Sequence, residues 1–194
     1  MKYLFFTFFL TILSLFSCSN TERTGKFSFN DDWRFMIEDD FASQNITFFQ
    51  FEYDDSDWEK IRLPHSANIE PLTVNDQWQG VCWYRKSFFV PDTYDEKEGW
   101  IEFEAAMNHS IIWLNGIKVA ENNGGYLPVV IDVTDHIIPG KKNLIAVRLN
   151  NEDNPVTGPK PLKILDFNMY GGLYRNAWLI VKDKVHISHP VLAQ

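Results

Sequence analysis

The dipeptide Asn115-Gly116, set between two apolar runs in "SIIWLNGIKVAE", is the feature that most restricts how this chain can fold. Asn followed by Gly tolerates the positive φ angles that a type I′ turn needs at both central positions. Such a turn joins two antiparallel strands directly. The stretch therefore predicts a β-hairpin.

Short apolar runs separated by turn signals continue through the chain from residue 27 onward. No stretch keeps helical periodicity for more than about a turn or two. Further strands are predicted in "KFSFNDDWRFMI", "KIRLP", "CWYRKSFFVP", "GWIEFEAA", "YLPVVIDVT", "KKNLIAVRLN" and "NAWLIV". Eight or more antiparallel strands with irregular connections predict an all-β chain whose two sheets pack as a jelly-roll β-sandwich rather than a barrel.

The strand "GWIEFEAA" places two carboxylates on one face. Side chains alternate along a strand, so Ile101 and Phe103 face one way while Glu102 and Glu104 face the other, about 7 Å apart. That spacing mimics a catalytic carboxylate pair. Nothing nearby in the sequence raises the pKa of either group enough to hold a proton at neutral pH, so a solvated strand face is the better explanation.

The first residues, "MKYLFFTFFLTILSLFSC", have the layout of a secretory signal rather than of a membrane span. The ending at Cys18 resembles a bacterial lipobox, in which the cysteine becomes the lipid-modified first residue; a plain cleaved signal is the alternative. We expect residues 1–18 to be this signal, residues 19–26 to be a short linker, and the protein to be exported and lipid-anchored to a bacterial membrane, in the periplasm or at the cell surface. With Cys18 lipidated, Cys82 is the only thiol left, and no intrachain disulfide forms.

The composition favours a sugar over a nucleic acid as partner. The net charge of -8 and the lack of a basic stripe argue against a phosphate backbone. Aromatic residues make up 15% of the chain, with seven tryptophans. The faces of tryptophan and tyrosine pack against the apolar C–H face of a sugar ring, so this content mildly favours a carbohydrate binder.

Two loop stretches are candidate edges of a site. In "LDFNMYGGLYRNAWLIV", Gly171 and Gly172 stand before a predicted buried strand and mark a tight bend or a close backbone approach. The stretch "NNEDNPVTGPKPLKIL" is long and rich in Asn, Pro and Gly. Long loops inside a compact domain are usually functional or mobile.

Five spaced motifs carry a resemblance to a known family. They are "LPHSANIEP", "WQGVCWYRKSFFVP", "IWLNGIKVAENNGGYLPVVIDVT", "NLIAVRLNN" and "DFNMYGGLYRNAWLIV". The chain resembles the N-terminal sugar-binding domain of glycoside hydrolase family 2, the family of β-galactosidases, β-glucuronidases and β-mannosidases. The resemblance implies a galactose-binding-domain-like jelly roll over residues 27–188. In whole enzymes of this family, an immunoglobulin-like domain and a TIM barrel with two catalytic glutamates follow, so residues 189–194 are expected to begin the linker to a missing second domain.

The resemblance also implies a sugar-binding carboxylate. Asp166 stands five residues before Gly171, where similar β-galactosidases have an aspartate that binds the terminal sugar and a nearby cation. A carboxylate accepts strong charge-assisted hydrogen bonds from two vicinal hydroxyls. The alternative is that Asp166 braces its own turn. A cation near Asp166 is expected only in an assembled enzyme, and no other cofactor is expected.

Four further residues are candidates, each with an alternative: the resemblance points to Asn68, Asn75 and Arg175, and side-chain chemistry points to Trp78. Either Asn68 or Asn75 matches a family asparagine that contacts the sugar. Trp78 either stacks on a sugar or packs in the core. Arg175 lies either at the interface with the barrel or in a contact that braces its loop.

Three other residues are assigned structural or inert roles. His65 in "LPH" is expected to serve the fold, and without a second histidine or cysteine at ligand spacing no zinc site is expected. Tyr126 after "NNGG" is expected to pack between the sheets. Glu152 follows Asn151 as in the family's acid/base dipeptide, but it stands in a loop and is not expected to be catalytic.

Together these observations predict the non-catalytic sugar-binding module of an exported family 2 glycoside hydrolase, most similar to a β-galactosidase, that helps to shape the active-site mouth. Retaining hydrolysis needs two carboxyl groups roughly 5 Å apart, which the family's barrel supplies, so the chain alone is expected to be inactive. Its partners would be a carbohydrate with a terminal β-linked sugar, the missing domains, and a membrane only through the lipid. The alternatives are a free-standing secreted lectin-like module and a structural or adhesion β-sandwich.

Overall fold

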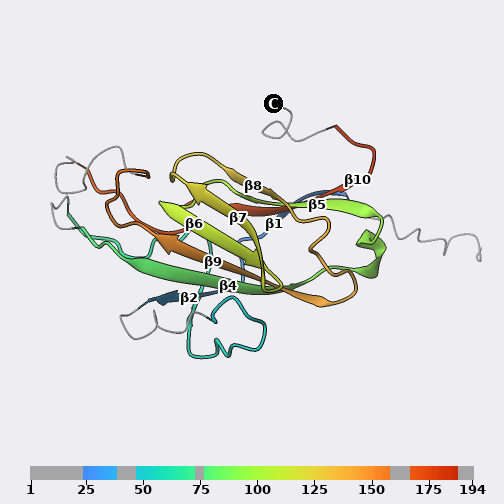
Figure 1. The fold of residues 1–194 in the computed structure, drawn as a ribbon, viewed down its shortest axis with the longest axis horizontal. Helices are drawn as coiled ribbons and strands as arrows, with labels where there is room; N and C mark the ends of the chain where they lie inside the picture. The colour runs from blue at the N-terminus through green and yellow to red at the C-terminus, as the bar shows by residue number, and fades with distance from the viewer. Residues whose placement is uncertain (1–23, 39–46, 73–76, 158–166, 188–194) are drawn as a thin grey trace, which may run out of the picture.

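The computed structural model describes residues 24–38, 47–72, 77–157 and 167–187, and these form ten strands (Figure 1). A 3-10 turn, η3 (Asp92–Tyr94), is the one helical element in these ranges. None of their helices is long and apolar enough to cross a membrane. The strands are β1 (Gly25–Ser28), β2 (Trp33–Ile37), β3 (Glu59–Ile61), β4 (Val81–Phe89), β5 (Lys97–Phe103), β6 (His109–Leu114), β7 (Ile117–Asn123), β8 (Val129–Asp132), β9 (Lys142–Asn150) and β10 (Ala177–Asp183).

The strands form two antiparallel sheets that face each other (Figure 1). One sheet has the order β1-β10-β5-β8, and the other has the order β3-β2-β4-β9-β6-β7. Neighbours in the sheets are mostly distant in sequence, as expected for a jelly roll. The predicted all-β, two-sheet sandwich is confirmed.

The predicted hairpin is also confirmed. Asn115 and Gly116 have φ angles of 52° and 83°, and Leu114 pairs with Ile117 across the turn. Both central residues thus have the positive φ of a type I′ turn.

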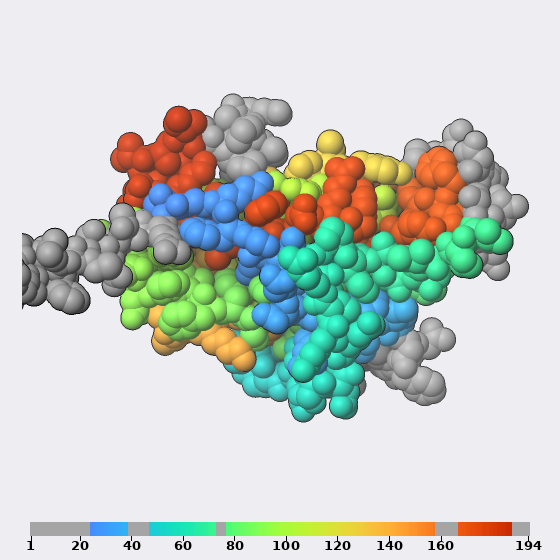
Figure 2. Space-filling model, turned by 180° about the vertical axis from the view of Figure 1, so that it is seen from behind, coloured from blue at the N-terminus to red at the C-terminus, as the bar shows by residue number. Residues whose placement is uncertain are grey.

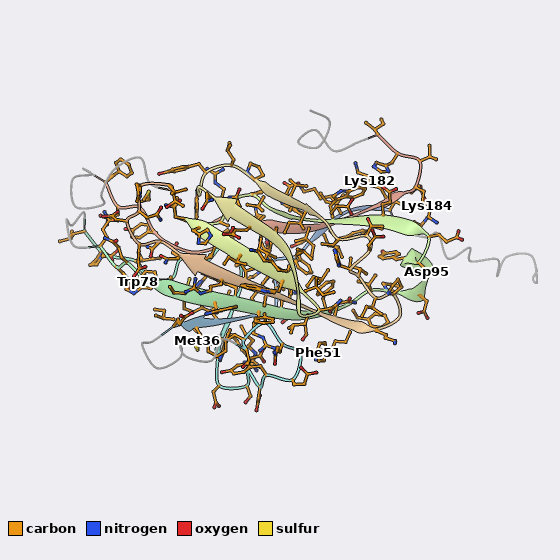
Figure 3. All side chains as sticks on the ribbon, viewed as in Figure 1. Met36, Phe51, Trp78, Asp95, Lys182 and Lys184 are labelled. Carbon is orange, nitrogen blue, oxygen red and sulfur yellow. The ribbon has the colours of Figure 1, made fainter. Side chains whose placement is uncertain are left out.

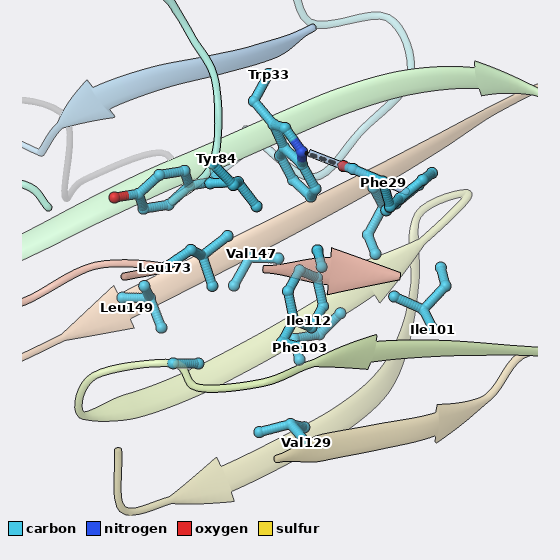
Figure 4. Packing of buried hydrophobic residues seen from close by; sticks show 14 of the residues in the cluster. Phe29, Trp33, Tyr84, Ile101, Phe103, Ile112, Val129, Val147, Leu149 and Leu173 are labelled. Carbon is cyan, nitrogen blue, oxygen red and sulfur yellow. Dashed lines mark hydrogen bonds between the residues drawn. The ribbon is translucent and has the colours of Figure 1, made fainter. Parts of the chain in front are cut away.

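The main core fills the space between the sheets (Figure 4). Trp33 is fully buried there, and its indole Nε1 donates a hydrogen bond to the backbone oxygen of Phe29 at 2.7 Å. Ile101 and Phe103 point into this core, as the alternation in their strand predicts. Burying such side chains contributes about 1.5–3 kcal/mol each to folding.

A second apolar cluster lies on the outer face of the six-stranded sheet, and the sequence did not predict it. Residues 47–58, here called the outer segment, run below β4 in Figure 1 and carry Phe51 in Figure 3. Phe48 and Trp58 from this segment pack on Trp83 of β4. Arg85 is 2% exposed beneath it, with its Nε 3.1 Å from a carboxylate oxygen of Asp55.

The outer face of the four-stranded sheet is less solvated than expected. Glu102 is only 7% exposed, and its Oε1 lies 3.0 Å from Nζ of Lys26. Glu104 accepts hydrogen bonds from Trp178 Nε1 at 2.8 Å and Asn176 Nδ2 at 3.1 Å. The expectation of a solvated face was wrong for Glu102, because β10 and β1 bring long side chains across it.

Candidate functional site

Three loop segments that are distant in sequence meet at one end of the sandwich. They are residues 63–72, 77–80 and 167–174. Trp78 is labelled at this end in Figure 3, and Asp95 beside η3 marks the opposite end. From behind, the segment after β3 and the segment before β10 lie together at the right of the molecule (Figure 2).

A backbone seam ties these segments together. Residues 65–67 form two hydrogen bonds with residues 171–173, at 2.9 and 2.8 Å. Met107 exchanges two more with Gly172, at 3.0 and 3.1 Å. The seam formed by residues 65–67, 171–173 and Met107 therefore extends strand-like pairing into the loops, which fixes the segment that follows Asp166 in the sequence.

The two glycines are required by this close approach. Gly172 has a φ of +130°, and a Cβ there would lie 2.7 Å from the backbone oxygen of His65 and 2.8 Å from the hydroxyl of Tyr84. A Cβ on Gly171 would lie 2.8 Å from the side-chain amide of Asn151. The prediction that this pair marks a close backbone approach is confirmed.

Two buried amide side chains hold the loops, and sequence analysis missed both. Gln77 is 5% exposed; its Nε2 donates to the oxygen of Phe167 at 3.0 Å, and its Oε1 accepts from the N–H of Met169 at 2.6 Å. Asn151 is 3% exposed; its Nδ2 donates to the oxygen of Trp78 at 3.0 Å, and its Oδ1 accepts from the N–H of Gly80 at 2.8 Å. The only sequence signal for Gln77 and Asn151 was that each amide side chain stands in or beside a loop that contains glycine.

Three of the predicted functional residues, Asp166, Asn75 and Cys18, lie outside the described residues. Their roles stay predictions. So does the cation expected near Asp166. Within the described ranges, no group of three or more His, Cys, Asp or Glu side chains is placed to hold a metal ion.

Asn68 is exposed and forms part of a small polar network. Its Nδ2 donates to Oε1 of Glu70 at 2.7 Å, and the same oxygen accepts from the N–H of Trp78 at 2.7 Å. Burial raises the pKa of Glu70, but the hydrogen bonds from Trp78 and Asn68 outweigh burial and lower the pKa overall. Glu70 is therefore ionised at neutral pH and holds Asn68 at the loop surface.

Trp78 and Arg175 lie at the rim of this end. Trp78 is half-buried and packs against the main core, and a Cβ on Gly80 would lie 3.0 Å from its ring. Arg175 is exposed, with its guanidinium 5.6 Å from the centre of the Tyr174 ring.

His65 joins the loop to the core. Its Nδ1 lies 2.9 Å from the hydroxyl of Tyr84, and its ring packs on Phe35 at 4.6 Å between centroids. Burial lowers the pKa of His65, and the smaller influence of Glu59 acts in the opposite direction.

Tyr126 does not pack between the sheets, so that expectation was wrong. It is 51% exposed, and its hydroxyl donates to the sulfur of Met169 at 3.2 Å. The reason is its position: β7 ends at Asn123 and β8 begins only at Val129, so Tyr126 lies in the connecting loop beyond the sheets.

The high tryptophan content is explained largely by packing. Of the seven tryptophans, four are buried: Trp33, Trp58, Trp83 and Trp100. Their number alone is therefore a weak argument for a sugar-stacking surface.

Comparison with known proteins gives a consistent result. Residues 28–183 match the family described as "Glycosyl hydrolases family 2, sugar binding domain". A β-galactosidase from Thermoanaerobacter pseudethanolicus is 33% identical over 163 residues, which are 82% of this chain and 21% of the relative. A β-glucuronidase from Formosa agariphila is 31% identical over 187 residues, which are 89% of this chain and 18% of the relative.

Solved structures agree with these relatives. A β-glucuronidase of Bacteroides uniformis superposes with a TM-score of 0.72 at 28% identity, over 82% of this chain and 18% of that one. A β-glucuronidase from glycoside hydrolase family 2 gives a TM-score of 0.74 at 29% identity, over 88% of this chain and 19% of that one. The chain thus spans about a fifth of the length of the proteins it matches.

Proposed function

This chain belongs to the family of sugar-binding domains found in glycosyl hydrolases family 2. We therefore propose that it is the non-catalytic module that helps to shape the active-site mouth of an exported β-glycosidase. The observation that supports this proposal is the end of the sandwich where the three loop segments meet. The seam and the Gln77 amide hold residues 167–173 in one fixed arrangement directly after Asp166 in the sequence. A carboxylate at such a position suits the hydroxyls of a terminal sugar.

The proposed ligand is a terminal β-linked sugar, with galactose as the first choice. The names of the relatives divide between β-galactosidase and β-glucuronidase, so glucuronate is the second. Catalysis itself would come from two carboxyl groups elsewhere in the assembled enzyme, because retaining hydrolysis needs such a pair roughly 5 Å apart.

A chimera tests this proposal. Residues 24–187 of this chain replace the matching segment of the Thermoanaerobacter pseudethanolicus β-galactosidase. The chimera should hydrolyse p-nitrophenyl β-D-galactoside faster than the same relative without any N-terminal segment, and free galactose should inhibit it. The same assay with the glucuronide tests the second sugar.

In this chimera, Asp166→Asn should weaken inhibition by free sugar about ten- to hundredfold, the loss expected for a charge-assisted hydrogen bond of roughly 1.5–3 kcal/mol. Glu152→Gln is the matched control, since it neutralises an exposed carboxylate in the neighbouring loop. A folded chimera no faster than the truncated relative would contradict the proposal. A lowered unfolding midpoint of Asp166→Asn with unchanged inhibition would make Asp166 a turn brace.

We also propose that Cys18 carries the lipid that anchors the protein. An acyl chain contributes about 0.8 kcal/mol per buried methylene to membrane binding. The precursor should therefore partition into the membrane fraction of expressing bacteria, and Cys18→Ala should release it. A Cys18→Ala protein that still sediments with membranes would rule the anchor out.

A further inference from the structure

An apolar hollow of about 410 Å³ opens beside the seam. Its volume falls within the range of small-molecule pockets, roughly 300–1,000 Å³. Its floor is two methionines, Met107 and Met169, which are 3% and 6% exposed. Phe167 and Tyr126 also line it, and they are about half-exposed, at 49% and 51%.

The tyrosine hydroxyl groups around the hollow already donate to the protein. Tyr126 donates to Met169 Sδ at 3.2 Å, and Tyr174 donates to the oxygen of Gly125 at 2.6 Å. Tyr170 donates to the oxygen of Glu70 at 3.0 Å. Burial raises the pKa of Tyr174, so its hydroxyl stays protonated and keeps this bond. What these tyrosines offer a ligand is therefore ring surface rather than hydrogen-bond donors.

Apart from Ser66 and Asn168, the lining consists of aromatic residues and methionines, and it suits a flat apolar ring better than a sugar edge rich in hydroxyls. Aromatic rings pack on one another in stacked or edge-to-face arrangements, and methionine sulfur makes favourable contacts with aromatic rings. The hollow combines both kinds of contact, with Phe167 standing next to Asp166 in the sequence.

We propose that this hollow binds the aromatic aglycone of a β-glycoside, the leaving-group ring rather than the terminal sugar. The inference rests on the proposed function, because it assigns the hollow to the leaving-group side of the same ligand. Phe167 and Tyr126 supply the walls, and Met107 and Met169 supply the floor.

Two measurements test the proposal: titration of the protein with each of three small-molecule probes, and transfer of NMR saturation from the protein to each bound probe. The probes are phenyl β-D-galactoside, methyl β-D-galactoside and phenol. Phenyl galactoside should bind several times more tightly than methyl galactoside, and its aryl protons should receive most of the transfer.

Variants of the two walls locate the aryl site. Phe167→Ala and Tyr126→Ala should each weaken binding of phenyl galactoside and of phenol about two- to tenfold, the effect of losing one aromatic contact. Tyr126→Phe should bind like the parent, since it keeps the ring. Leu127→Ala is the matched control, because Leu127 is 78% exposed beside Tyr126 and does not line the hollow.

The outcomes separate this inference from the proposed function. If phenyl and methyl galactoside bind the folded chain equally, or no probe binds, or Phe167→Ala changes nothing, the hollow is not an aglycone site, whatever the chimera shows about galactose. If phenol binds and Phe167→Ala weakens its binding, while the chimera neither binds nor hydrolyses a galactoside or a glucuronide, the aryl site is supported and the proposed sugar-binding function is contradicted.

Discussion

The side-chain amide of Gln77 and the backbone N–H of Met169, 92 positions apart in sequence, form a 2.6 Å hydrogen bond that closes the loop end of the sandwich. The other half of the same amide donates to the oxygen of Phe167. One side chain therefore satisfies two backbone groups of the segment that carries the candidate site. Stability and site geometry are coupled at this residue.

Gln77→Ala is expected to destabilise the fold by about 2–4 kcal/mol, because it leaves a backbone donor and a backbone acceptor without their partner. Denaturant unfolding measures this change. Gln79→Ala is the control: Oε1 of Gln79 accepts from Asp153 N–H at an exposed position, so its loss should cost less than about 1 kcal/mol. Equal costs for the two variants would show that the Gln77 amide does not organise the loops.

Gly172→Ala is expected to cost about 3 kcal/mol or more, since it adds both a strained φ and a clash with backbone. Gly124→Ala isolates the first effect. Gly124 also has a positive φ, of +104°, but a Cβ there meets nothing within 4 Å. Its substitution should cost about 1 kcal/mol. Similar unfolding midpoints for the two variants would mean that the seam shifts enough to accommodate the added methyl group, and that the clash costs little.

The stability of the domain should fall as the pH drops from 7.5 to 5.5, partly through His65. Burial lowers the pKa of His65 in the folded state below its usual value of 6.5. The unfolded chain therefore binds a proton more readily, and this contribution is complete above about pH 6.5 and is lost as the pH falls. Its slope cannot exceed about 1.4 kcal/mol per pH unit.

Unfolding curves of His65→Asn across this pH range check the assignment, and the slope should be smaller than in the parent. His136→Asn serves as the control, because its contact with Asn115 is made by the backbone oxygen and not by the ring. If the parent and His65→Asn show the same slope, another group is responsible.

Cys82 should react with a thiol reagent only when the protein unfolds. It is 1% exposed, and burial raises the pKa of its thiol. In a Cys18→Ala background, labelling of the folded chain should be roughly a thousandfold slower, or more, than in denaturant, as set by the rare unfolded population. A cysteine introduced at exposed Leu127 should label at once. Rapid labelling of Cys82 would show that β4 opens locally.

The chain alone is expected to hydrolyse no chromogenic β-glycoside. Glu102 of β5 pairs with Lys26, and Glu104 just after β5 accepts a hydrogen bond from Trp178, so both carboxylates are engaged in structural contacts. Glu152 is exposed and accepts from Asn150. Release of p-nitrophenol above the buffer rate that survives purification and disappears in Glu152→Gln would overturn this expectation.

The features that were predicted correctly depend on local chemistry. The Asn115-Gly116 turn and the alternation around Ile101 are readable because each residue's neighbours in sequence determine its conformation. Gly171 and Gly172 likewise marked a close approach before its partner was known. The pattern of short strands and turns predicted the two-sheet sandwich, and the family motifs implied the same fold.

The features that were missed depend on contacts between distant positions. Nothing near Gln77 in sequence indicates that its amide meets Met169, and nothing in residues 47–58 indicates that they cover β4. Tyr126 was misplaced because the predicted strand "YLPVVIDVT" began at this residue, whereas β8 begins only at Val129. The role of Asp166 stays a prediction because this residue lies outside the described residues.

The outer segment over β4 has a consequence for how this sequence can diverge. Most sheet strands in a sandwich have one face on solvent, where substitutions are nearly neutral. Trp83 and Arg85 point toward the outer segment while Cys82 and Tyr84 point toward the main core, and all four are at most 2% exposed. In the middle of β4, a substitution at any of these four positions therefore disturbs packing. These residues can change only together with their contacts, either in the main core or in the outer segment.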